Sequence, residues 1–101
     1  MVLTRTLLGA AVAILVFNAN AFAAEAHYAC SGGTKLTAQF SPPSAARGRV
    51  KLTFETGRNI TLPQVMSADG GRYANNDIEF WIKGRNATLA RGGVSDTCST
   101  R

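Results

Sequence analysis

Few side chains in this sequence have the type and position that acid–base or nucleophilic chemistry requires. His27 is the only histidine, and we expect it at a frayed end of the folded domain, where a general base is poorly positioned. Ser67 has no base partner in the pattern of the sequence. Gly70-Gly71 is too short for a phosphate-binding loop and precedes no helical segment. None of these residues predicts a catalytic site.

Two carboxylates, Asp77 and Glu79, share one face of a strand if that strand begins at Asp77. Glycosidases also use paired carboxylates, but they place them on opposite sides of a substrate cleft. Nearby exposed positions on one strand do not supply that arrangement. We therefore expect a protein that is not an enzyme and that uses no metal and no cofactor.

The first 23 residues have the features of a secretory signal peptide. Arg5 and the amino terminus give a positive start, and an apolar run extends from Leu7 to Phe17. At 1.5 Å per residue, that run is too short to cross a bilayer core of about 30 Å. Small residues follow, and Ala23 is the preferred last residue of the signal.

Cleavage there would leave residues 24–101 as one small domain. Cleavage after Ala21 or Ala26 would also fit the small-residue pattern. A lipoprotein would need a cysteine directly at the cleavage site, whereas the first cysteine is Cys30. We therefore expect a soluble periplasmic domain that has no membrane anchor in its mature form.

The two cysteines, Cys30 and Cys98, are predicted to form a structural disulfide, because export places them in an oxidising compartment. The sequence has no Cys-x-x-Cys motif, and two cysteines with one histidine cannot complete a closed four-ligand zinc site. Closing a loop of about 69 residues contributes about 4 kcal/mol in the chain-entropy model. That is comparable with the net stability of a small domain.

Beyond the signal, apolar and polar residues alternate with the two-residue period of β-strands. Such runs lie at 35–40, 50–54, 60–62, 78–83 and 87–89. Glycine, proline and asparagine fall between the runs as turn signals. Short antiparallel strands with one apolar face each hide that face and their edges by closing on themselves. The sequence therefore predicts an all-β fold, a small antiparallel barrel without helices.

An ordered set of short motifs stands out between Leu62 and Leu89. The motifs are Leu62-Pro63, Ser67-Ala68-Asp69-Gly70-Gly71-Arg72-Tyr73, Phe80-Trp81-Ile82-Lys83-Gly84 and Ala87-Thr88-Leu89. Together with Tyr28-Ala29-Cys30 and the later Cys98, they resemble the MliC/PliC family of bacterial inhibitors of c-type lysozyme. The resemblance covers nearly all of the chain after the signal. It implies an eight-stranded antiparallel β-barrel and a periplasmic inhibitor of c-type lysozyme.

The resemblance also implies an inhibitory site, in which a loop and a lysine enter the substrate cleft of lysozyme. The residues that it assigns to partner binding are Ser67, Asp69, Gly70, Arg72, Tyr73 and Lys83. The strand pattern supports the position of Lys83 independently, because residues 78, 80 and 82 take the core face and residue 83 then points outward. Lysozyme acts through two carboxyl groups and an oxocarbenium-like transition state. An ammonium against that pair would occupy the place of the substrate.

Asp69 departs from the family pattern, which has a serine in the motif Ser-Gly-x-x-Tyr. Asp69 could accept a hydrogen bond from the protonated catalytic glutamate, or it could pair with Arg72 while Ser67 supplies the hydroxyl. It could also mark a different target, or only shape the turn before Gly70. Two roles are likewise open for Tyr73: its side chain either fills the barrel or anchors the interface with the partner.

The charge of the chain leads to a kinetic prediction. Eleven lysines and arginines stand against six acidic residues, a net charge of +5, and removal of the signal with Arg5 leaves +4. Because c-type lysozymes are also basic, we expect slow association that accelerates when salt screens the repulsion.

A rival hypothesis is that the basic barrel binds single-stranded nucleic acid or anionic polysaccharide. Lysines and arginines would supply positive charge, and Trp81 a ring on which bases stack. Arg47, Arg49, Lys51 and Arg58 cluster before and within the second and third predicted strands, where they either keep the basic face away from the partner or face anionic polymers of the cell envelope. Stacking platforms need two or three exposed rings, so we expect no nucleic-acid partner. A structural role in the cell envelope and a homodimer both stay open.

Overall fold

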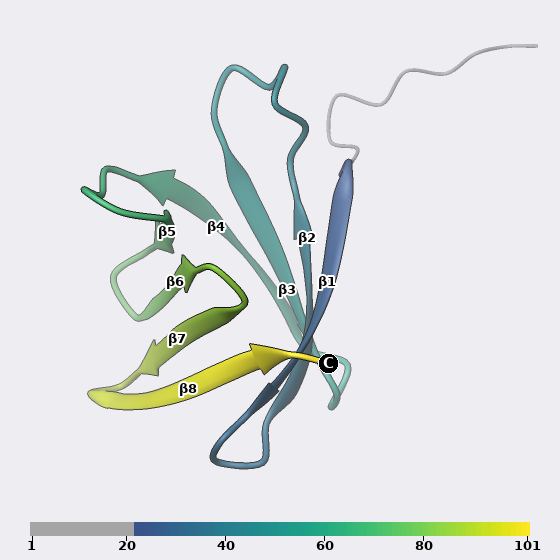
Figure 1. The fold of residues 1–101 in the computed structure, drawn as a ribbon, viewed down its shortest axis with the longest axis vertical. Coiled ribbons are helices and arrows are strands. Elements are labelled where there is room, and N and C mark those ends of the chain that lie inside the picture. The colour runs from purple at the N-terminus through teal and green to yellow at the C-terminus, as the bar shows by residue number, and fades with distance from the viewer. Residues whose placement is uncertain (1–21) are drawn as a thin grey trace, which may run out of the picture.

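The structure, a computed structural model, describes residues 22–101, which form a closed barrel of eight antiparallel strands (Figure 1). The strands are β1 (Ala24–Cys30), β2 (Lys35–Phe40), β3 (Arg49–Phe54), β4 (Asn59–Val65), β5 (Gly71–Ala74), β6 (Ile78–Lys83), β7 (Asn86–Arg91) and β8 (Val94–Thr100). Each strand pairs with the next along the chain, and β8 pairs with β1. The predicted all-β antiparallel barrel is therefore confirmed.

Side chains that alternate inward from the strands fill the barrel. Phe80 is completely buried, and the ring of Tyr28 packs edge-on against it with 5.2 Å between the ring centroids. The buried residues are Tyr28, Cys30, Leu36, Ala38, Val50, Leu52, Leu62, Tyr73, Phe80, Ala87, Leu89 and Cys98. The interior of an eight-stranded barrel is just wide enough for such side chains to fill. The hydrophobic core and the barrel interior are therefore the same space.

The predicted disulfide between Cys30 and Cys98 is present. The two residues face each other where β1 and β8 pair, over residues 28–30 and 98–100. The bond therefore holds together the first and last strands, at the seam that closes the barrel.

His27 lies within β1 and not at a frayed end, so that expectation was wrong. The strand pairs with β2 from Ala24 to Ala29. The His27 ring is held on both sides, with Nδ1 3.0 Å from Thr37 Oγ1 and Nε2 3.2 Å from a carboxylate oxygen of Glu25. Backbone pairing along the whole strand orders this segment.

The predicted signal peptide, residues 1–23, lies outside the described residues except for its last two positions, so its cleavage stays a prediction. The amide of Ala23 donates a hydrogen bond to the Phe40 carbonyl over 2.9 Å. Cleavage after Ala23 would leave β1 complete. Between residues 22 and 101, the structure contains no helix long and apolar enough to span a membrane.

The strand connections alternate between the two ends of the barrel, because consecutive strands are antiparallel. The β2–β3, β4–β5 and β6–β7 connections lie at one end, which we call the Lys83 end. The β1–β2, β3–β4, β5–β6 and β7–β8 connections lie at the other, which we call the Arg91 end.

Candidate functional site

Strand β6 carries outward-facing side chains to the Lys83 end of the barrel. Phe80 points into the core, so Glu79, Trp81 and Lys83 project from the opposite face of the strand. Glu79 and Trp81 are half-buried by their neighbours, whereas Lys83 is exposed. The outward position predicted for Lys83 from the alternation is therefore the one observed.

A tight turn ends the strand directly after this lysine. Lys83 pairs with Asn86, and the two residues between them form the β6–β7 turn. Gly84 occupies the first turn position with a φ of 64°. Two-residue hairpin turns of this kind favour glycine there, because a side chain is strained at positive φ. The turn thus leaves Lys83 at the rim of the barrel.

Trp81 connects the lysine to the β4–β5 turn. The indole Nε1 donates a hydrogen bond to the backbone carbonyl of Asp69 over 2.7 Å. The Lys83 Nζ lies 4.4 Å from the centroid of the Trp81 ring, a cation–π contact. One side chain therefore fixes this turn, residues 66–70, which we call the Asp69 turn, and orients the ammonium beside it.

The Asp69 turn also packs directly on the backbone of β6. Gly70 has a φ of 66°, and a Cβ atom at this position would overlap the carbonyl oxygen of Ile82. Inside the turn, the Ser67 hydroxyl lies 2.7 Å from the Gly70 carbonyl oxygen and 3.1 Å from that of Asp69. Ser67 thus uses its donor within the turn, which leaves its oxygen only as an acceptor for a partner.

Arg72 pairs with Glu79 and not with Asp69, so the internal Asp69–Arg72 pair considered from the sequence is not formed. Both Nε and Nη2 of Arg72 lie 2.5 Å from Glu79 Oε2. The register places Arg72 opposite Trp81, with Glu79 diagonally across on the same face. The guanidinium also lies 5.2 Å from the centroid of the Trp81 ring. The charge of Arg72 is therefore compensated within the site.

Lys83 and Asp69 keep uncompensated charges. Across residues 22–101, the ion pairs are His27–Glu25 and Arg72–Glu79. Both Lys83 and Asp69 are exposed, and within this part of the chain neither side chain has an ionic partner. The site therefore presents one ammonium and one carboxylate to a partner.

Tyr73 belongs to the barrel core. Its side chain is 9% exposed, and its ring centroid lies 5.8 Å from that of Phe40. Burial raises the pKa of the Tyr73 phenol above its ordinary value. Of the two roles considered from the sequence, the structure supports the side chain that fills the barrel. Tyr73 supports the site indirectly, because its buried ring anchors strand β5 in the core.

The sequence-based site omitted Trp81 and Glu79, which organise it. A signal for Trp81 was present in the motif Phe80-Trp81-Ile82-Lys83, because even a half-buried indole N–H usually bonds to an acceptor. Asp77 lies in a turn before β6, where its amide donates to Asn75 Oδ1 over 2.7 Å, so it does not share a strand face with Glu79. Among the described residues, no group of three or more His, Cys, Asp or Glu could hold a metal ion.

A family model described as "Membrane-bound lysozyme-inhibitor of c-type lysozyme" matches residues 28–97. The chain belongs to this family. The matched region contains the Asp69 turn, Trp81 and Lys83, so every element of the site lies within the family domain.

Two relatives support the assignment to this family. A membrane-bound lysozyme inhibitor of C-type lysozyme from Yersinia enterocolitica is 42% identical over 65 residues, which cover 64% of this chain and 51% of the relative. The chain thus spans about half the length of that relative. The crystal structure of Pseudomonas aeruginosa MliC in complex with hen egg white lysozyme matches with a TM-score of 0.67 and 25% identity, over 93% of this chain and all of that chain.

Proposed function

We propose that this protein inhibits a c-type lysozyme by inserting the tip of the 67–73 loop, residues 67–70, and the Lys83 side chain into the substrate cleft, while residues 71–73 stay in strand β5 of the barrel. The observation that carries the proposal is the joint contact of Trp81 with the Asp69 carbonyl and the Lys83 ammonium. It presents a loop and a cation as one projecting unit at one end of the barrel. The names of the two relatives support the same target.

The charge of Lys83 suits the catalytic centre of a lysozyme. That centre holds a protonated glutamic acid and an ionised aspartate, and it stabilises a cationic transition state. Because Lys83 has no ionic partner among the described residues, its ammonium is available to the ionised carboxylate. A charge-assisted hydrogen bond of this kind contributes about 1.5–3 kcal/mol.

The Asp69 side chain is suited to bind the second catalytic carboxyl group of lysozyme, that of the protonated glutamic acid. With Arg72 engaged by Glu79, the Asp69 carboxylate is available to accept a hydrogen bond from the protonated catalytic glutamic acid. Its backbone carbonyl meanwhile accepts the bond from Trp81. In this arrangement Asp69 both shapes the turn and contacts lysozyme. The Lys83 ammonium pairs with the ionised catalytic aspartate and thereby offsets the repulsion between that aspartate and Asp69.

We place this activity in the periplasm, after cleavage of residues 1–23, and we propose that the protein is not an enzyme. The disulfide between Cys30 and Cys98 suits an oxidising compartment. The rival nucleic-acid hypothesis is weakened by the site itself. Arg72 and Lys83 both contact the Trp81 ring, so the indole is engaged within the protein and is a poor platform for bases.

A lysis assay tests the proposal directly. Purified domain is mixed with c-type lysozyme and bacterial cell walls, and lysis is followed as loss of turbidity. We expect inhibition by the wild type, and we expect Lys83→Ala to weaken binding by about 2–5 kcal/mol because a desolvated charge loses its partner.

Lys51→Ala is the matched control, because Lys51 lies on β3, which β4 separates from β5 and β6 in the barrel. It removes the same charge from the chain and should leave inhibition intact. Unchanged lysis at a micromolar excess of the wild type would exclude the proposed function. Equal losses in the two lysine variants would show that net charge, and not the Lys83 position, determines inhibition.

A further inference from the structure

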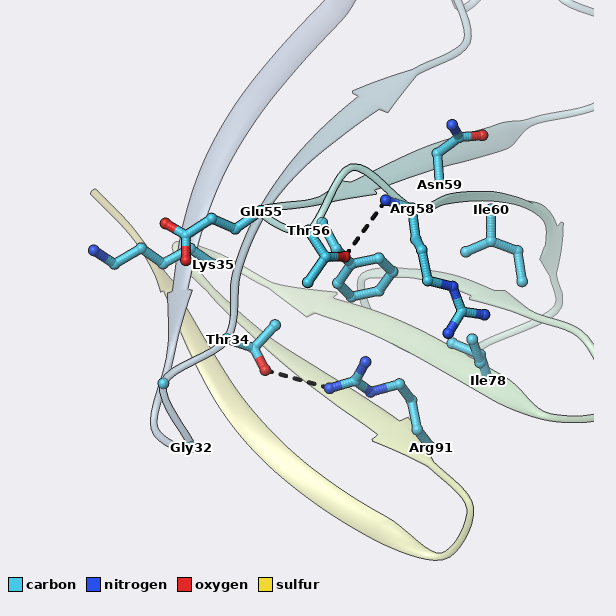
Figure 2. Close-up of a pocket in the computed structure, with 12 residues that line it drawn as sticks. Gly32, Thr34, Lys35, Glu55, Thr56, Arg58, Asn59, Ile60, Ile78 and Arg91 are labelled. Carbon is cyan, nitrogen blue, oxygen red and sulfur yellow. Dashed lines mark hydrogen bonds between the residues drawn. The ribbon is translucent and has the colours of Figure 1, made fainter.

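A pocket of about 650 Å³ opens at the Arg91 end of the barrel. Its walls come from the β1–β2 and β3–β4 turns, the beginning of β6 and the end of β7 (Figure 2). Pockets that hold small molecules have volumes of about 300–1,000 Å³. This pocket therefore has the size of a ligand site, and it lies at the opposite end of the barrel from Lys83.

The floor of the pocket is apolar. Phe54, Ile60 and Ile78 line it and pack against the hydrophobic core. Each of the three is only half-buried, so part of its apolar surface is open to the pocket. Covering apolar surface contributes about 25 cal/mol per Å². The floor therefore favours a ligand with a hydrocarbon or aromatic body.

One guanidinium is fixed in the wall of the pocket. Arg91 Nη2 donates to Thr34 Oγ1 over 3.3 Å, and the Arg91 Cζ lies 5.1 Å from the centroid of the Phe54 ring. These contacts orient the group, and its other N–H donors have no hydrogen-bond partner within residues 22–101. An ordered guanidinium loses less conformational entropy when it binds an anion.

A second guanidinium, that of Arg58, extends toward the same space (Figure 2). Neither Arg58 nor Arg91 forms an ion pair within residues 22–101. Among the described residues that line the pocket, Glu55 is the only carboxylate. In Figure 2 its side chain lies beside that of Lys35 at the far edge of the pocket, away from both guanidinium groups. The Glu55 amide also bonds to the Lys35 carbonyl over 3.0 Å. The inner part of the pocket is therefore positively charged.

We propose that this pocket binds a small amphiphilic carboxylate. The carboxylate group pairs with the guanidinium groups of Arg58 and Arg91, because the planar fork of arginine matches carboxylate geometry. The apolar body of the ligand covers Phe54, Ile60 and Ile78. This site is independent of the lysozyme-binding site and would operate whether or not the protein inhibits lysozyme.

The test is an NMR titration of the ¹⁵N-labelled, disulfide-bonded protein with three probes. Decanoate carries both the charged group and the chain, acetate carries only the charged group, and decanol carries only the chain. We expect saturable shifts with decanoate at the amides of Thr34, Thr56 and Arg91, and at least tenfold weaker binding of acetate and of decanol. Equal binding of acetate would exclude a role for the apolar floor. Equal binding of decanol would exclude recognition of the anion.

Substitutions test whether the two arginines bind the carboxylate of the ligand. Arg58→Gln and Arg91→Gln should each weaken decanoate binding at least fivefold, whereas Arg47→Gln, which removes the same charge from the β2–β3 connection at the other end, should not. If Arg91→Gln perturbs the fold, the result for Arg58→Gln is decisive, because the Arg58 guanidinium forms no hydrogen bond or ion pair among the described residues. Unchanged binding in Arg58→Gln would overturn the proposal. Inhibition of lysozyme should be unchanged in Arg58→Gln and Arg91→Gln, so failure here is distinguishable from failure of the proposed function.

Discussion

The two ends of this barrel differ in how they use cationic side chains. At the Lys83 end, Trp81 holds a turn and an ammonium together so that both project from the protein. At the Arg91 end, the guanidinium groups surround a hollow with an apolar floor. A projecting charge suits the cleft of a larger partner, whereas a recessed charge suits a small ligand. One core thus supports two surfaces that can be changed separately.

Loss of the disulfide should affect both ends, because it acts on the shared barrel. We expect the double substitution Cys30→Ala and Cys98→Ala to lower the free energy of unfolding by about 4 kcal/mol, since the bond closes a long loop of the unfolded chain. Urea unfolding measures this change. Lysozyme inhibition and decanoate binding should then be lost together as urea is added. A variant as stable as the wild type would show that strand pairing alone closes the barrel.

A pair of glycine substitutions should separate the two ends. Gly70 and Gly57 both have positive φ, but a Cβ atom would overlap the Ile82 carbonyl at residue 70 and meets no atom within 4 Å at residue 57. Both alanine variants should lose about 1–2 kcal/mol of stability from backbone strain. Only Gly70→Ala should also displace the Asp69 turn and weaken lysozyme inhibition. Equal inhibition by the two variants would contradict a role for the turn.

A smaller effect should follow from removing one hydrogen bond at the Lys83 end. Trp81→Phe keeps an aromatic ring near Lys83 but removes the Nε1–H donor that holds the Asp69 carbonyl. One such bond contributes about 1 kcal/mol, so we expect about fivefold weaker lysozyme binding by calorimetry. Decanoate binding at the other end should not change. Wild-type affinity for lysozyme in Trp81→Phe would show that the turn is held by Gly70 and Ser67 alone.

Alkaline pH should lower the stability of the shared core and so affect both ends of the barrel alike. Burial raises the pKa of Tyr73 above its ordinary value of 10.0, and burial together with the nearby Tyr73 raises that of Tyr28. The folded protein therefore holds these protons more tightly than the unfolded chain. This contribution to stability is complete below pH 10 and is lost as the pH rises through the higher folded-state values.

Thermal unfolding at a series of pH values measures this effect. The Tm should fall as the pH rises above 10, and the fall should be shallower in Tyr73→Phe, which keeps the ring and removes the titrating group. Parallel Tm curves for the wild type and Tyr73→Phe would assign the alkaline transition to other groups.

Much of the barrel could be predicted from the sequence because five strands place apolar side chains inward at every second position. Strands β1, β5 and β8 lack that pattern and were not found from alternation. Strand β5 has four residues and buries only Tyr73, and β8 buries only Cys98. For these strands, pairing with neighbours and the disulfide determine the structure. Neither of those is visible in local periodicity.

The outward position of Lys83 was predictable for the same reason, since it follows from its alternation with the buried Phe80. The contacts between side chains within the site were not predictable. The bond from Trp81 to Asp69 and the pairing of Arg72 with Glu79 both depend on the register between β5 and β6. A shift of one residue would turn these side chains to the other face. Sequence spacing alone therefore left the partner of Arg72 open.

The most direct test of the central claim is to locate the surface that lysozyme covers. The ¹⁵N-labelled protein is titrated with unlabelled c-type lysozyme, and the amides that shift or broaden are mapped on the barrel. We predict that the changes gather at Asp69, Gly70 and Lys83 and that the amides of Thr34, Thr56 and Arg91 are unaffected. Changes confined to the Arg91 end, or no changes at saturating lysozyme, would contradict the proposed inhibitory site.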